Sequence, residues 1–183
     1  METIGTRVYP ERHHRKRVIL LCASLMLLAL AAGCGGGGGS TEQGAGARLI
    51  TGKGFEFNAP SDWAPALTAR AAVVKRDGVT LVSVTVLPLV KPYRPQLFPR
   101  VVGELDRLAG ELAGRLQGRV TERRTVIVAG RRVRQYEITH GEFADRLTFV
   151  LRGKQEFLLT CRWRKQDGEP AACPQLASSF RLR

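Results

Sequence analysis

Residues 120–163 read VTERRTVIVAGRRVRQYEITHGEFADRLTFVLRGKQEFLLTCRW, and this stretch decides the fold class of the chain. Apolar and polar residues alternate along it, which is the pattern of strands that turn one face to a core. Turn signals divide the stretch at Ala129-Gly130, His140-Gly141 and Gly153-Lys154. We therefore predict four consecutive strands joined by short turns, which form an antiparallel meander.

One clear helix precedes this meander. Apolar residues recur there at steps of four, four, three, four and four positions, which is the period of an α-helix. They are Leu97, Val101, Leu105, Leu108, Leu112 and Leu116. We predict a helix over 97–116 whose apolar stripe packs on the core, and a second, short helix over 173–180.

Three strands are expected before the main helix. Residues 54–60 form a short strand that ends at Pro60. Residues 71–76 and 79–87 flank Asp77-Gly78, which indicates a two-residue hairpin because both turn positions tolerate positive φ. The prolines that follow are expected to break the sheet, since proline cannot donate to a strand ladder. They are Pro88, Pro92 and Pro95.

These elements together predict an α+β fold. We expect an antiparallel sheet of about six to seven strands, packed against one main helix and a short C-terminal helix. A single extracytoplasmic domain is expected over residues 48–183.

The N-terminal residues have the order of a secretory signal, with basic residues at 12–17 and an apolar run at 18–32. The run ends in Leu30-Ala31-Ala32-Gly33-Cys34, which resembles the lipobox of bacterial lipoproteins, although Ala31 stands where the family more often has Leu. An uncleaved transmembrane helix is the less favoured alternative. The run is shorter than the ~20 residues that span a bilayer, and glycines follow it.

The lipobox resemblance implies cleavage before Cys34 and a diacylglyceryl group on its sulfur. We therefore expect a lipoprotein signal peptide over 1–33, and the lipidated Cys34 with a Gly-rich linker over 34–47. This would hold the domain on the extracytoplasmic face of the cell membrane. A plain signal peptide, and so a freely secreted protein, is the alternative.

Two cysteines remain in the domain, Cys161 and Cys173. Export places them in a compartment that permits disulfides, so we predict that they pair. Two buried free thiols are the alternative.

A diffuse set of motifs over residues 52–183 looks like the PsbP-like superfamily. The motifs are an opening Gly54, Phe55, Phe57, Pro60 and Trp63, a hairpin from Gly130 to Tyr136, and a closing Ser178-Ser179-Phe180. The resemblance implies a small α/β/α sandwich with a binding or assembly role. It supplies no catalytic residues.

The chain is strongly basic, with a formal net charge of +13. Loss of residues 1–33 would remove five Lys or Arg and two Glu, and leave +10. Nucleic acid is the usual partner of such a charge, but the export signal argues against it.

Five arginines cluster on the predicted hairpin of 120–139 and form a candidate anion-binding site: Arg123, Arg124, Arg131, Arg132 and Arg134. The expected partner is an anionic lipid, a wall polymer or an acidic face of an envelope protein. The alternative is a solvated sheet edge whose charges prevent aggregation.

The sequence shows no catalytic or metal-binding pattern. His140 is the one histidine after residue 33, and its turn position indicates a solvated surface residue. Glu142 and Asp145 flank the same turn and are interpreted as solubilising charges. We expect no catalytic residue, no metal and no cofactor, and predict a non-enzymatic binding or assembly module of the cell envelope. The alternative is a carrier for an apolar ligand held between the sheet and the 97–116 helix.

Overall fold

The computed structural model describes residues 46–183. The predicted signal peptide, the predicted lipidation site Cys34 and nearly all of the predicted linker lie outside these residues. Within the described part, no helix is long and apolar enough to cross a membrane.

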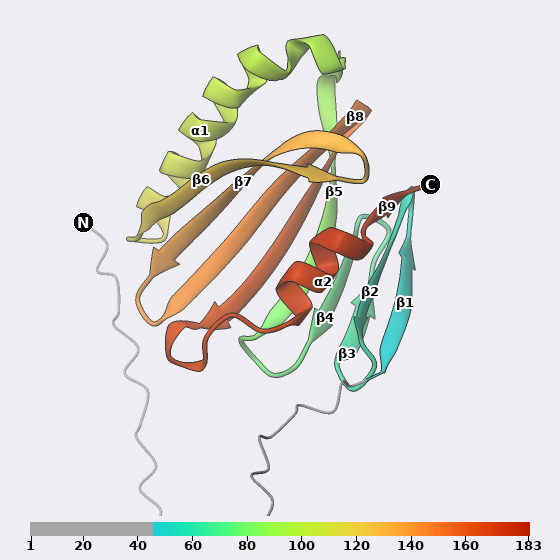
Figure 1. Ribbon diagram of the computed structural model, residues 1–183, viewed down its shortest axis with the longest axis vertical. Helices are drawn as coiled ribbons and strands as arrows, with labels where there is room; N and C mark the ends of the chain where they lie inside the picture. The colour runs from blue at the N-terminus through green and yellow to red at the C-terminus, as the bar shows by residue number, and fades with distance from the viewer. Residues whose placement is uncertain (1–45) are drawn as a thin grey trace, which may run out of the picture. The chain divides into compact units, whose positions relative to one another are not determined.

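A six-stranded antiparallel sheet forms the centre of the domain, in the order β3-β4-β5-β8-β7-β6 (Figure 1). Its strands are β3 (Ala64–Leu67), β4 (Ala71–Lys75), β5 (Leu81–Tyr93), β6 (Arg119–Val128), β7 (Arg131–His140) and β8 (Phe143–Arg164). The predicted meander is confirmed here, because β6 pairs with β7, β7 with β8, and β8 with β5, all antiparallel.

Strand β8 folds back on itself. Its residues 143–149 pair with β7, whereas its residues 153–162 pair with β5. Asp145 and Arg162 are 17 positions apart, a separation of roughly 56 Å in a straight strand, yet their side chains lie 2.6 Å from each other. Gly153 has φ +54° at the reversal, a conformation that favours glycine. Residues 151–154, called the β8 bend below, therefore contain the turn expected at Gly153-Lys154.

A small second sheet and the C-terminal helix cover one face of the large sheet (Figure 1). The small sheet has the order β1-β2-β9, from β1 (Ala47–Gly52), β2 (Phe55–Pro60) and β9 (Arg181–Leu182). Helix α2 (Ala172–Ser179) lies against β2 and β8. Phe55, Phe57, Phe157 and Phe180 are fully buried in the core between these layers. The small sheet was not predicted, since β1 and β9 are short edge segments.

The disulfide between Cys161 and Cys173 is present, with the Cα atoms 5.5 Å apart. Both cysteines are buried and belong to this core. The bond therefore joins β8 to the first turn of α2.

Helix α1 (Phe98–Arg115) covers the opposite face, over β6 and β7 (Figure 1). A short 3₁₀ turn, η1 (Pro95–Leu97), leads into it. Its buried residues Leu105, Ala109 and Ala113 recur every four positions and pack with Tyr136 and Ile138.

The leucine stripe is only partly in this core. Leu105 is buried, whereas Leu108 is 39% exposed. The small side chains of Ala109 and Ala113 centre the helix on the sheet, and this leaves Leu108 at the margin of the contact.

Two local predictions are wrong in part. The hairpin predicted around Asp77-Gly78 is present, since β4 and β5 pair antiparallel, but its loop is longer than two residues, and the Arg76 N–H donates to the Thr80 carbonyl over 2.9 Å. The Asp77 carboxylate accepts from the Val79 and Thr80 N–H groups, both at 2.7 Å. This Asx-type turn needs no positive φ, and Gly78 is not among the positive-φ residues.

The prolines after Leu87 interrupt the sheet but do not end β5, because the ladder with β8 is irregular between Pro88 and Tyr93 while the strand continues to Tyr93. The Val86 N–H donates to Arg70, which precedes β4. Main-chain nitrogens two positions apart in a strand point to the same side, so the nitrogen of Pro88 faces the β4 side, as the Val86 N–H does. The ladder of β5 with β4 ends at Thr85, so β4 offers no partner at that position. Pro88 therefore removes no ladder hydrogen bond on that open side. Overall, the predicted α+β class with its main helix and short C-terminal helix is confirmed.

Candidate anion-binding site

The five arginines predicted as one cluster lie on both faces of the β6–β7 hairpin. Arg123 is opposite Tyr136, which packs under α1, whereas its neighbour Arg124 is opposite Gln135 on the other face. By the same alternation Arg132 and Arg134 share the α1 face, and Arg131, opposite Val128, shares the α2 face. The structure therefore does not bring the five together in one patch.

Arg134 is largely buried and pairs with a carboxylate of the domain itself. Its guanidinium donates to both oxygens of Asp106 on α1, at 2.9 and 3.2 Å. The Tyr136 hydroxyl donates to the same carboxylate at 2.6 Å. The hydrogen bond from Arg134 holds the pKa of Asp106 below its ordinary value. Burial, with help from Asp106, raises the pKa of Tyr136.

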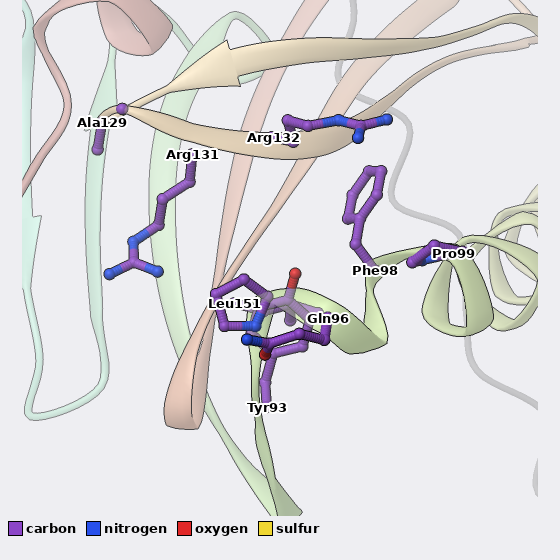
Figure 2. A pocket seen from close by; sticks show the side chains of 10 residues that line it. Tyr93, Gln96, Phe98, Pro99, Ala129, Arg131, Arg132 and Leu151 are labelled. Atoms are coloured by element: carbon purple, nitrogen blue, oxygen red, sulfur yellow. The ribbon is translucent and has the colours of Figure 1, made fainter.

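Two others of the five also have partners. Arg124 donates to Gln135 at 2.7 Å and lies 3.2 Å from Glu122. The Arg132 guanidinium lies over the Phe98 ring, 5.0 Å from its centroid. Figure 2 shows this stacking, and shows Arg131 extending from the hairpin away from it. Of the predicted residues, Arg131 and Arg132 therefore face a hollow.

Three hollows surround the β8 bend. The first, of about 540 Å³, lies between the β6–β7 turn and the start of α1 (Figure 2). It is lined by Tyr93, Pro95, Gln96, Phe98, Pro99, Ala129, Gly130, Arg131, Arg132 and Leu151. We call it the aromatic hollow. Burial raises the pKa of Tyr93, against the effect of Arg131 and Arg132, so the phenol stays protonated at neutral pH.

The second hollow, of about 470 Å³, is called the arginine hollow. Arg131, Arg152 and Arg181 line it, with Ala129, Gly130 and Leu182. Arg152 donates to the Arg183 carbonyl, and Arg181 to the Ser178 and Phe180 carbonyls, each at 2.8 Å. Main-chain oxygens thus hold these two guanidinium groups in place at the hollow.

The third hollow, of about 320 Å³, is called the lysine hollow. Lys53, Arg70 and Lys154 line it, together with Ala69, Val86, Leu87, Pro88 and Gln155. The three hollows share the bend as their common wall, because Leu151, Arg152 and Lys154 each line one of them.

The side chains that line the three hollows carry one sign of charge. Seven Lys and Arg residues line the three hollows and no Asp or Glu does. None of the seven forms an ion pair with a carboxylate side chain of residues 46–183, whereas Arg76, Arg107, Arg146 and Arg162 elsewhere do. We call these seven residues the basic surface. They are Lys53, Arg70, Arg131, Arg132, Arg152, Lys154 and Arg181.

Sequence reasoning missed five of these residues, because they come from separate turns. Lys53, Arg70 and Lys154 lie in or beside turns between strands, and only the strand order brings them to one end of the sheet. The sequence signal that could have revealed these residues is the recurrence of a basic residue in several of the turns between strands.

His140 and Asp145 differ from their interpretation as surface charges. The Asp145 residue is 2% exposed, and the His140 side chain only 12%. His140 Nε2 lies 2.9 Å from Asp145 Oδ2, and Arg162 donates to both oxygens of the carboxylate, at 2.6 and 2.8 Å. Asp145 is buried because the folded-back β8 supplies Arg162 as its partner. Glu142 is exposed, as expected.

The trio links the end of β7 to both arms of β8. The carboxylate is fully engaged by Arg162, and the hollow of about 360 Å³ that His140 lines contains no serine or cysteine. Among residues 46–183 no group of three or more His, Cys, Asp or Glu could hold a metal ion.

The space between α1 and the sheet, where the carrier alternative would place an apolar ligand, is filled by packed side chains. Leu105, Ala109 and Ala113 are buried there against Tyr136 and Phe149. The neighbouring aromatic hollow lies at the N-terminal end of the helix and is bordered by arginines.

Comparison with known proteins supports the fold alone. No family model matches the chain, and no curated protein matches it. The solution structure of cyanobacterial PsbP from Synechocystis is similar over 81% of this chain and 98% of that one, with a TM-score of 0.57 and 15% sequence identity. A Bacteroides thetaiotaomicron crystal structure matches 77% of this chain and 49% of its own, with a TM-score of 0.49 and 13% identity. The described domain therefore has a PsbP-like α+β fold.

Proposed function

We propose that this chain is a bacterial lipoprotein, anchored through Cys34 on the extracytoplasmic face of the membrane, whose domain binds an anionic partner without catalysis. The basic surface carries this proposal. Seven cationic side chains converge on the β8 bend from five separate segments of the chain, with no carboxylate among them.

The physical argument is one of uncompensated charge. Like charges that are held close together repel, and an anion between them removes that cost. Arginine forks also match the geometry of phosphate and carboxylate groups. Arg131, Arg152 and Arg181 around one hollow thus favour a partner with phosphate or carboxylate groups.

The proposed location on the outer face of the membrane rests on the sequence. The basic segment, the apolar run and the small residues before Cys34 together support export and lipidation. An exported domain does not meet cytoplasmic nucleic acid, so the proposed partner is a lipid, a wall polymer or an envelope protein.

A non-enzymatic role fits the described chemistry. The Asp145 carboxylate is bound by both His140 and Arg162, and no serine or cysteine lines the His140 hollow. The carrier alternative gains no support from the packed contact of α1 with β7.

Inorganic polyphosphate is a suitable probe, because it presents phosphate groups without a lipid or a protein. We expect Arg131→Ala combined with Arg152→Ala to weaken its binding roughly tenfold or more. The matched control is Arg115→Ala with Lys165→Ala, which removes the same charge at the other end of the sheet and should change binding little. Equal losses in both double variants would show a non-specific charge effect and overturn the proposed site.

A further inference from the structure

The last residues of β5 project beside the basic surface. We call residues 87–93 the β5 tip. The ladder of β5 with β4 ends at Thr85, and within the tip only Leu87, Pro88 and Tyr93 pair with β8. Val90 is 98% exposed and Leu87 is 40% exposed. An apolar side chain held this far into solvent at the end of a strand gains nothing for the fold.

Cations surround the apolar tip. Leu87 and Pro88 line the lysine hollow together with Lys53, Arg70 and Lys154. Lys91 and Arg94 follow in the chain, and neither forms an ion pair within the described part of the protein. Apolar residues ringed by positive charge match the headgroup boundary of an anionic bilayer, which is negative outside and apolar beneath.

We propose that the β5 tip docks the domain on an anionic membrane surface, with Val90 and Leu87 entering the headgroup boundary and the basic surface facing lipid phosphates. This inference rests on the proposed function, and it identifies the anionic partner as membrane lipid. A hydrated polymer would also satisfy the cations, but it offers nothing to Val90. The exposed apolar residues therefore favour a bilayer over a soluble polyanion.

The backbone of the tip suits this environment. Unpaired N–H groups are costly near lipid tails, where no water replaces the lost hydrogen bonds. Pro88 and Pro92 have no N–H, so two of the seven residues of the tip bring no such cost. Tyr93 adds an aromatic side chain with a polar end, a residue type enriched at membrane interfaces.

The proposed anchor can reach the same bilayer. Ala47 pairs with Pro60 at one end of the small sheet, and Gly52 pairs with Phe55 at the other end, next to Lys53. Strand β1, which separates these two ends, is therefore about 20 Å long. The chain from Cys34 to Ala47 spans at most about 45 Å when extended. A lipid on Cys34 and the β5 tip can therefore contact one membrane together.

The test uses residues 40–183, so that no acyl chain contributes to binding. Residues 46–183 contain both hydrophobic clusters and the disulfide, so this part of the chain has its own core and can fold without the preceding residues. Co-sedimentation is measured with mixed phosphatidylcholine–phosphatidylglycerol vesicles and with pure phosphatidylcholine vesicles. We expect binding to the mixed vesicles only, with Val90→Asp weakening it about tenfold and Lys53→Glu with Lys154→Glu abolishing it.

Leu49→Asp is the matched control, because Leu49 is also an exposed apolar residue, at 58%, but lies in the middle of β1. It should bind as the wild type does. Equal binding by Val90→Asp and the wild type would overturn the docking of the tip, and so would equal binding to both kinds of vesicle. If the domain binds polyphosphate but not vesicles, the membrane inference fails and the proposed function stands. If it binds neither, both fail.

Discussion

Asp145 and Arg162 hold the two halves of β8 together through two hydrogen bonds, of 2.6 and 2.8 Å, on a carboxylate that is almost fully buried. His140 binds the same carboxylate from the end of β7. Three segments of the sheet thus meet on one side chain. The pair keeps the two arms of β8 in register, and the β8 bend at their far end supplies Arg152 and Lys154 to the basic surface.

Asp145→Asn should lower the free energy of unfolding by about 1–3 kcal/mol. The amide keeps one acceptor oxygen but loses the charge and the second acceptor, so the contacts of Arg162 and His140 cannot all be kept. Urea unfolding at neutral pH measures the change. Glu142→Gln, an exposed neighbour, should stay within about 0.5 kcal/mol of the wild type. Equal stability of Asp145→Asn and the wild type would show that the trio contributes no net stability.

The contact of Asp106 with Arg134 predicts a pH dependence of stability. Because Arg134 lowers the pKa of Asp106 in the folded state, this carboxylate stabilises the fold above the unfolded pKa of about 3.9. The contribution is lost as the pH falls through the lower folded-state pKa. Asp106→Asn should therefore be less stable than the wild type at neutral pH, and the difference should shrink below about pH 4. A difference that stays constant on acidification would contradict this assignment.

The disulfide should contribute about 3 kcal/mol, since it closes a short loop between β8 and α2. Cys161→Ala with Cys173→Ala should lower the denaturation midpoint accordingly. Both sites are buried in a well-packed core, so a loss near zero would mean that the reduced chain is held equally well by packing alone.

Lipidation is tested by the intact mass of the protein made in its host. The wild type should have the mass of residues 34–183 plus a diacylglyceryl group, and it should fractionate with membranes. Cys34→Ala should lose the added mass. An unmodified or uncleaved wild-type chain would contradict the proposed anchor.

Much of the fold follows from local sequence signals. The alternation of residues 120–163 and the glycine turns determine the meander, and the helical period determines α1. Strand β3 is exposed along its whole length and therefore has no alternation to detect. The continuation of β5 past Pro88 depends on which side of the strand is paired, and that is a property of the assembled sheet.

The site was less predictable, for two different reasons. The division of Arg123 and Arg124 between two faces follows from strand geometry alone, and could have been foreseen. The gathering of Lys53, Arg70 and Lys154 could not, because it requires the strand order. The burial of Asp145 likewise depends on its pairing with Arg162 across the β8 bend.

The location of anion binding is tested most directly by titrating isotope-labelled protein with inorganic polyphosphate and following the backbone amide resonances. The largest shifts should occur at Lys53, Arg131, Arg152 and Lys154, with residues around Arg115 and Lys165 unaffected. Shifts that are spread evenly over the surface, or centred on the His140 end of the sheet, would contradict the basic surface as the binding site.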